Sequence, residues 1–171
     1  MRYSDIPKYT SCGNYSVHHT LDYFVDWIQK QKEELSLELN PDFQRGHVWT
    51  ELQQVKYIEH ILAGGKTSIE FYFNQAGWMN DFEGEFVCVD GLQRITSIQK
   101  FINNEIKAFG YYLDEYENKD VMLRKIHIIV NVNNLKTRKE VLKWYIEFNS
   151  GGTIHTEEEI NRVKELLDKE K

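Results

Sequence analysis

One stretch of the sequence, residues 86–98, constrains the fold more than any other, because it reads as a strand that turns directly into a helix. Residues 86–89 are four apolar, partly β-branched residues, and this pattern predicts a buried strand. An Asp-Gly pair, Asp90 and Gly91, then interrupts the strand pattern. From Leu92 onward, apolar residues recur every three or four positions, which predicts a helix. The chain is therefore expected to turn sharply at this Asp-Gly pair.

This turn contains groups that are suited to an anion such as phosphate. The first backbone N–H groups of a helix have no partner within the helix, and the helix dipole is positive at that end. Gly91 lets a ligand approach the backbone closely. Arg94 falls at the edge of the apolar face of the helix, an unusual place for a guanidinium, and is therefore a candidate ligand-binding group. The alternative is a structural turn in which Arg94 pairs with a nearby acid. Neither a P-loop nor a Rossmann fingerprint is present.

The composition predicts one compact domain. A chain of 171 residues with 41% hydrophobic content can bury a real core.

A net charge of −6 argues against a broadly basic surface for nucleic acid. The two cysteines, Cys12 and Cys88, are too few for a disulfide framework or a zinc site, and we expect Cys88 to be a small core residue. No signal-peptide core and no apolar run of about 18 residues is found, so we expect a cytoplasmic protein without membrane association.

The rest of the pattern predicts an α+β fold in a single domain spanning residues 1–171. Residues 1–16 show no clear period and are expected to form an irregular arm. Thr-x-x-Gln and Thr-x-x-Glu capping boxes predict helix starts at Thr50, Thr137 and Thr156. Further helices are expected from about residue 18 and from residue 92, and strands at residues 68–73, 86–89, 106–113 and 126–132. We therefore expect a small mixed sheet packed with several helices.

A second Gln-Arg pair, Gln44 and Arg45, lies in a loop before the Thr50 helix. Arg45 could clamp a phosphate with two hydrogen bonds, and Gln44 could orient a water molecule. The pair could also be an ordinary part of a surface loop, but two such pairs at the ends of elements strengthen the functional interpretation of both.

A glycine-rich segment around Asn149 and Gly151 is the third candidate. It is either the end of a helix or a flexible loop whose Asn149 amide and free backbone N–H groups close over a ligand. The sequence has no H-E-x-x-H pattern and no G-x-S-x-G pattern, which argues against a zinc hydrolase and against a serine nucleophile on an elbow.

Three segments together resemble one family. Residues 43–49 read F-Q-R-G-H-V-W, residues 90–98 read D-G-L-Q-R-I-T-S-I, and residues 148–153 read F-N-S-G-G-T. They are similar, in order and approximate spacing, to the motifs Y-Q-R-x-x-V-W, D-G-Q-Q-R-L-T-T-L and N-x-G-G-x-x-L of the GmrSD-like domains, or domain-of-unknown-function family 262. Leu92 stands where the second motif has its first Gln.

The resemblance implies a ParB/sulfiredoxin-like fold that binds, and often hydrolyses, a nucleoside triphosphate at the D-G-Q-Q-R turn. Gly91 and the first helical N–H groups would hold phosphate oxygens, and Arg94 and Arg45 would neutralise charge. Asp90 would hold Mg²⁺ or, with Gln93, orient the attacking water. Gln44, Asn149 and Gly151 would complete the phosphate site.

Larger relatives act in defence against phage or modified DNA and carry a separate C-terminal nuclease domain. The chain ends at Lys171 and shows no H-N-H pattern, so we expect no nuclease domain and no nuclease activity from it. Two interpretations stay open beside a stand-alone NTPase module. One is a non-catalytic module that binds DNA or a partner protein. The other is a regulator or phage-encoded inhibitor of a defence system. The oligomeric state is left open.

Overall fold

The computed structural model describes residue 6, residues 15–44, 46, 48–150 and 157–170, and within them the side chains of all but residues 149, 150, 157 and 159. In chain order the elements are β1 Tyr15–Thr20, α1 Leu21–Leu35, α2 Glu51–Leu62, β2 Glu70–Gln75, β3 Phe86–Asp90, α3 Leu92–Ile102, the short 3-10 helix η2 Leu113–Glu115, α4 Lys119–Lys125, β4 His127–Asn133, α5 Arg138–Ser150 and α6 Glu157–Lys169.

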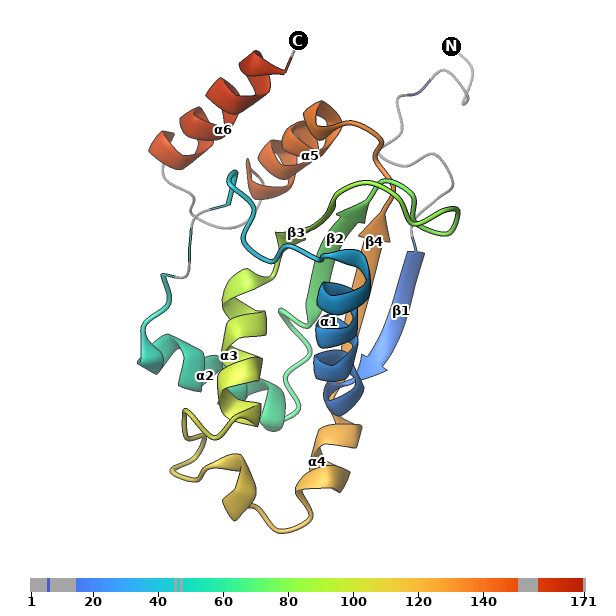
Figure 1. Cartoon of the computed structure of the whole chain (residues 1–171). Helices are drawn as coiled ribbons and strands as arrows, with labels where there is room; N and C mark the ends of the chain where they lie inside the picture. Colours follow the sequence, from blue (N-terminus) through green and yellow to red (C-terminus); the bar gives the residue numbers. More distant parts are fainter. Residues whose placement is uncertain (1–5, 7–14, 45, 47, 151–156, 171) are drawn as a thin grey trace.

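The four strands form one mixed sheet in the order β1-β4-β2-β3. β1 runs antiparallel to β4, β4 runs parallel to β2, and β2 runs antiparallel to β3. Helices surround this sheet, with α1 across one face and α5 and α6 at the opposite end of the molecule from α2 and α4 (Figure 1). The structure confirms the predicted fold class, a single α+β domain with a small mixed sheet packed with several helices.

Two apolar clusters hold the sheet in place. The larger joins the α1 face of the sheet to α1, α2 and α3, with Phe24, Phe71 and Ile95 fully buried in it. The smaller lies on the other face of β3, where Val87 and Val89 pack with side chains of α5 and α6. β3 is thus buried on both faces, as its uninterrupted run of apolar residues predicts.

The two capping predictions that fall on described residues are confirmed. At α2, the backbone N–H of Gln53 donates to Thr50 Oγ1 at 3.4 Å, and the backbone N–H of Thr50 donates to Gln53 Oε1 at 2.9 Å. At α5, Thr137 and Glu140 make the same reciprocal pair. Thr156, the third predicted cap, lies outside the described residues.

The start of the chain differs from the prediction. The expected arm at residues 1–16 overlaps β1, which starts at Tyr15, and the helix expected from residue 18 begins only at Leu21. His18 is therefore a strand residue, and it pairs with Ile129 of β4. The prediction was wrong here because pairing with a strand more than 100 residues away decides the conformation, and no local pattern reveals that pairing.

The strand expected at residues 106–113 is also wrong. The segment makes only an isolated bridge between Ala108 and Tyr111, and η2 follows it. Ile106 and Ala108 are buried from a loop instead, whereas Phe109 and Tyr111 are exposed. The seven-residue helix α4, which the sequence did not predict, comes next and leads into β4.

Candidate functional site

The predicted strand-turn-helix is confirmed, and Gly91 makes it possible. Gly91 lies between β3 and α3 with φ at +125°, a conformation that favours glycine. A Cβ atom at this position would lie 2.6 Å from Cδ1 of Phe71, too close for any side chain. Gly91 is the N-cap residue of α3 and makes no side-chain hydrogen bond. The backbone N–H groups at the start of α3 therefore have no partner in an N-cap side chain.

Asp90 stands at a β-bulge at the end of β3. Tyr72 pairs with Asp90, whereas the next residue, Phe73, pairs with Cys88, so β3 has one extra residue in between. Bulges redirect the side chains next to them and are frequent near functional sites. The Asp90 side chain is 35% exposed, so its carboxylate reaches solvent at the turn.

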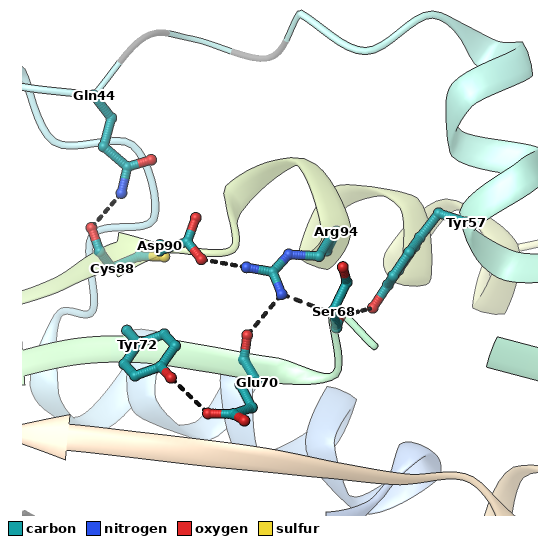
Figure 2. A network of polar contacts seen from close by, with 8 residues as sticks. All are labelled: Gln44, Tyr57, Ser68, Glu70, Tyr72, Cys88, Asp90 and Arg94. Atoms are coloured by element: carbon teal, nitrogen blue, oxygen red, sulfur yellow. Dashed lines mark hydrogen bonds and ion pairs between the residues drawn. The ribbon is translucent and has the colours of Figure 1, made fainter. Parts of the chain in front are cut away.

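Arg94 connects α3 to β2. Its Nη2 forms an ion pair with Asp90 Oδ2, and its Nη1 donates to the carbonyl oxygens of Ser68, at 3.1 Å, and Glu70, at 2.7 Å (Figure 2). The guanidinium carbon also lies 5.0 Å from the ring centroid of Phe71. Only 12% of the side chain is exposed. Arg94 thus pairs with a nearby acid, which the sequence had offered as the alternative to a direct ligand contact.

The two Gln-Arg segments lie against each other. Gln93 Oε1 accepts from the backbone N–H groups of Val48, at 3.0 Å, and Trp49, at 3.1 Å, and its Nε2 donates to the carbonyl of Gly46 at 3.1 Å. In the opposite direction, Gln44 donates from Nε2 to the carbonyl of Cys88 in β3 (Figure 2). Residues 44–49 are therefore held against the turn at both ends.

β2 supplies two site residues that the sequence analysis missed. The Tyr72 hydroxyl donates to Glu70 Oε2 (Figure 2). Both side chains lie on the face of β2 that faces away from α1, since Phe71 between them packs against α1. Burial, the hydrogen bond to Glu70 and the nearby negative charges raise the pKa of Tyr72 to about 12. Alternation along β2 places Glu70 and Tyr72 on one face, but only the pairing with β3 shows that Asp90 is their neighbour.

Arg162 of α6 is the other residue that the analysis missed. Its Nη2 donates to the carbonyls of Phe43, at 3.3 Å, and Gln44, at 2.8 Å. It therefore links the first Gln-Arg segment to α6. The sequence of α6 is so rich in charge that nothing in it marks one arginine as special.

Cys88 lies directly behind the turn and is inert. It is fully buried, and burial together with the negative charge of Asp90 raises the pKa of its thiol to about 12. The backbone of Leu92 makes a hydrogen bond with the thiol. This confirms Cys88 as a core residue and excludes it as a thiolate nucleophile at neutral pH.

Leu92 itself is buried, with 8% of its surface exposed. The position at which the chain differs from the D-G-Q-Q-R motif is therefore a packing position beneath the turn. The exposed part of the turn, formed by Asp90 and Gln93, keeps the residues of the motif.

The third motif reaches the same place through an aromatic contact. The ring of Phe148, near the end of α5, lies 4.6 Å from the ring of Tyr72, which pairs with Asp90. α5 includes Asn149 and ends at Ser150, so the helix extends into the expected break. The side chain of Asn149 and all of Arg45 and Gly151 lie outside the described residues.

A metal site made by the protein alone is not found among the described residues, where no three His, Cys, Asp or Glu side chains gather. None of the helices in the described ranges has the length and apolar character that a membrane span requires.

Comparison with known proteins gives one match. The family model described as GmrSD restriction endonuclease, N-terminal domain, matches residues 24–168, which include all three motifs. No curated protein and no solved structure matches the chain. Because the match covers most of the sequence, the chain belongs to the family of GmrSD restriction endonuclease N-terminal domains.

Proposed function

We propose that this domain binds a nucleoside triphosphate with Mg²⁺ at the turn formed by residues 90–94 and hydrolyses it. One observation carries the proposal: Gln93 and Gln44 join the two Gln-Arg segments at the N-terminal end of α3. Such a helix end suits phosphate, since its backbone N–H groups and its dipole both favour negative charge. Family membership is consistent with a role in phage defence.

Phosphate oxygens would accept from the backbone N–H groups in the first turn of α3. Gly91 keeps this end of the helix free of a side-chain cap. Arg45 follows Gln44, which is anchored to β3, and precedes Gly46, which is anchored to Gln93, so we propose it as the cation for the outer phosphates. Asn149 and Gly151 would approach from the end of α5.

The residues of the turn fit Mg²⁺ in the form in which it accompanies a nucleotide. Mg²⁺ is usually held by one or two carboxylates together with substrate phosphates and water. Asp90 offers one carboxylate that is partly exposed, and this is sufficient for that arrangement. When bound, the ion would reduce the negative charge on the phosphates.

Asp90 and Arg94 would act as a unit. Asp90 is the candidate that orients the attacking water, and Arg94 keeps the Asp90 carboxylate in place through its ion pair and its bonds to Ser68 and Glu70. Attack of this water on the γ-phosphorus breaks the bond to the β-phosphate oxygen and gives a nucleoside diphosphate and inorganic phosphate. In this scheme Arg94 is a positioning residue.

A second candidate function is binding of DNA or a partner protein without turnover. The observation in its favour is that Arg94 is already engaged by Asp90 and two carbonyl oxygens, as it would be in a purely structural turn. Measuring released phosphate separates the two functions, because only hydrolysis of the nucleotide produces it.

The test is a panel of the four ribonucleoside triphosphates with Mg²⁺, read by thermal stabilisation and by released phosphate. For the wild type we expect at least one nucleotide to raise the melting temperature and release phosphate. Asp90→Asn keeps the shape of the side chain and removes its charge, so we expect phosphate release to fall by about 100-fold or more. Asp26→Asn, which makes the same change on the exposed face of α1, should leave both readings unchanged.

Two outcomes decide between the candidates. Stabilisation without phosphate release would favour the non-catalytic module. Neither stabilisation nor release with any nucleotide would contradict nucleotide binding altogether.

A further inference from the structure

A hollow lined by none of the residues of the 90–94 turn lies where the C-terminal end of α2 and the helix α4 meet the sheet. We call it the α2–α4 pocket. Its volume is about 540 Å³, within the range of small-molecule sites. α2 and α4 are at the end of the molecule opposite to α5 and α6 (Figure 1).

The walls of the pocket are apolar. They come from three parts of the chain that are distant in sequence: the end of α2, the residue before β2, and α4 with the residue after it. The apolar lining residues are Ile61, Leu62, Ile69, Met122 and Ile126. A wall of this kind stabilises an apolar body by removing its surface from water, by about 25 cal/mol for each Å² buried.

The polar groups of the pocket are all basic or neutral. Lys66 and Lys125 line it, together with His18 of β1 and His127 of β4. No aspartate or glutamate is among the described residues that line it, although the chain as a whole has a net charge of −6. Four nitrogen-bearing side chains without an acid make this pocket complementary to a negative charge.

The two histidines lie on the same side of the sheet. His18 pairs with Ile129 and His127 pairs with Thr20, which makes them diagonal neighbours on adjacent strands. Both point away from α1, since Ile128, between His127 and Ile129, is buried on the α1 side. Glu70 follows on β2, across Ile129, but its carboxylate accepts from Tyr72.

The segment that carries Lys66 is held in place. The Gly65 amide donates to the carbonyl of His60 at 2.9 Å, and the Thr67 hydroxyl bonds with Nε2 of the same residue at 2.9 Å. A Cβ atom on Gly65 would lie 2.3 Å from the His60 ring, so the chain can pass this closely only as glycine. The backbone position of Lys66 is therefore fixed before any ligand binds, which lowers the entropy cost of binding.

We propose that the α2–α4 pocket binds a small organic anion: an apolar chain in the pocket and a carboxylate or phosphate monoester at Lys66, Lys125 and the two histidines. The apolar walls exclude a bare inorganic ion as the preferred ligand, and the lysines distinguish an anion from a neutral molecule of the same shape. The proposal is independent of the nucleotide site.

The test follows Met122 in the full chain by NMR with ¹³C-methyl methionine. The three methionines, Met1, Met79 and Met122, give one signal each, and Met122→Leu assigns the signal from the pocket. The probes are octanoate, octyl phosphate, octan-1-ol and inorganic phosphate. We expect octanoate or octyl phosphate to shift the Met122 signal with a dissociation constant of about 1 mM, typical of ligands of this size. The Met79 signal should not move. Comparing the affinities for octanoate and octyl phosphate shows which head group the pocket prefers.

The charge requirement is tested with the double variant Lys66→Gln/Lys125→Gln. Binding of the anionic probe should weaken by about tenfold, while octan-1-ol binding stays unchanged. Lys143→Gln/Lys164→Gln, which removes the same charge from exposed sites on α5 and α6, is the matched control and should bind as the wild type does. Added salt should weaken the binding of the anionic probe to the wild-type chain and should not weaken the binding of octan-1-ol.

Three results would overturn the proposal: no shift of Met122 with either amphipathic anion, equal affinity for octanoate and octan-1-ol, or full affinity in the Lys66→Gln/Lys125→Gln variant. Asp90→Asn should bind the anion normally, so failure of the nucleotide site would not be mistaken for failure of this pocket.

Discussion

Arg94 shows how a single residue can be marked by the sequence for one role and be used by the fold in another. Its unusual position at the edge of an apolar helix face pointed to a ligand. In the structure that position lets the guanidinium reach from α3 to Asp90 and to the carbonyls of Ser68 and Glu70. The residue that identifies the turn is thus also the one that holds it together.

Arg94→Ala should therefore destabilise the fold. The variant removes the partner of a partly buried carboxylate and of two carbonyl groups, so we expect the free energy of unfolding to fall by about 2 kcal/mol, measured by urea denaturation. Arg124→Ala is the control, since Arg124 pairs with Asp22 at 3.5 Å with a side chain that is 71% exposed, and it should cost less than about 0.5 kcal/mol. An Arg94→Ala variant as stable as this control would show that the Arg94 contacts are not structural.

The role of the Gln93 side chain can be tested through the two backbone amides that donate to it. Its Oε1 accepts from the amides of Val48 and Trp49. In Gln93→Ala these two amides should exchange with deuterium about tenfold faster, because each loses a hydrogen bond worth about 1 kcal/mol. Gln93→Glu keeps the acceptor oxygen and should preserve most of the protection. Unchanged exchange in Gln93→Ala would mean that residues 46–49 are held by other contacts.

At the scale of elements, β3 is the most deeply buried strand, and it contains a group that makes stability depend on pH. The Cys88 thiol keeps its proton to a pKa of about 12 in the folded chain, whereas an unfolded cysteine loses it at about 8.5. Above pH 9 the unfolded state therefore binds fewer protons than the folded state, and stability falls as the pH rises.

We expect this one thiol to contribute a loss of about 1.4 kcal/mol per pH unit between about pH 9 and the folded pKa. Urea denaturation of the wild type and Cys88→Ala at pH 8, 9 and 10 measures it. The slope of unfolding free energy against pH should be smaller in Cys88→Ala. The raised pKa values of Tyr57 and Tyr72, caused mainly by burial, act in the same direction in both proteins and leave a residual slope. Parallel slopes in the two proteins would contradict the burial of Cys88.

The elements that could be predicted from the sequence are those with local signals. The capping pairs at Thr50 and Thr137 mark helix starts through bonds that span three residues, and both are present. β3 and α3 could be predicted because a continuous run of apolar residues changes, at an Asp-Gly pair, to apolar residues at helical spacing. β1 could not be, since six residues with no strong period become a strand only by pairing with β4. α4 is only seven residues long, too short for a helical period to stand out.

The same division applies to the candidate site. Asp90, Gly91, Gln93 and Gln44 could be picked out because they occur at the ends of elements in recognisable pairs. Tyr72, Glu70 and Arg162 could not, because their neighbours in the site are set by strand pairing and by packing of α6. The sequence could not identify the partners of Arg94. They are Asp90 at the end of β3 and the carbonyl groups of Ser68 and Glu70, just before and at the start of β2.

At the scale of the whole molecule, the site is assembled from segments spread over most of the chain. The β3–α3 turn meets three groups of residues near one end of β3: Gln44, Val48 and Trp49 before α2, the start of β2, and Phe148 and Arg162 of α5 and α6. The α2–α4 pocket lies at the same end of the sheet but toward the opposite edge, beside β1 and β4, and the short segment that leads into β2 lies between the two sites. The two proposals thus assign two separate anion sites to one small domain.

In the proposed function, nucleotide phosphates bind at the N-terminal end of α3. The most direct test is amide NMR of the full chain titrated with the best nucleoside triphosphate and Mg²⁺. We expect the amides of Gly91, Gln93 and Arg94 to shift most, followed by those of Gly46 and Val48, while the amides of Met122 and Lys125 in the α2–α4 pocket stay in place. Saturable shifts elsewhere, with these five amides unmoved, would contradict it.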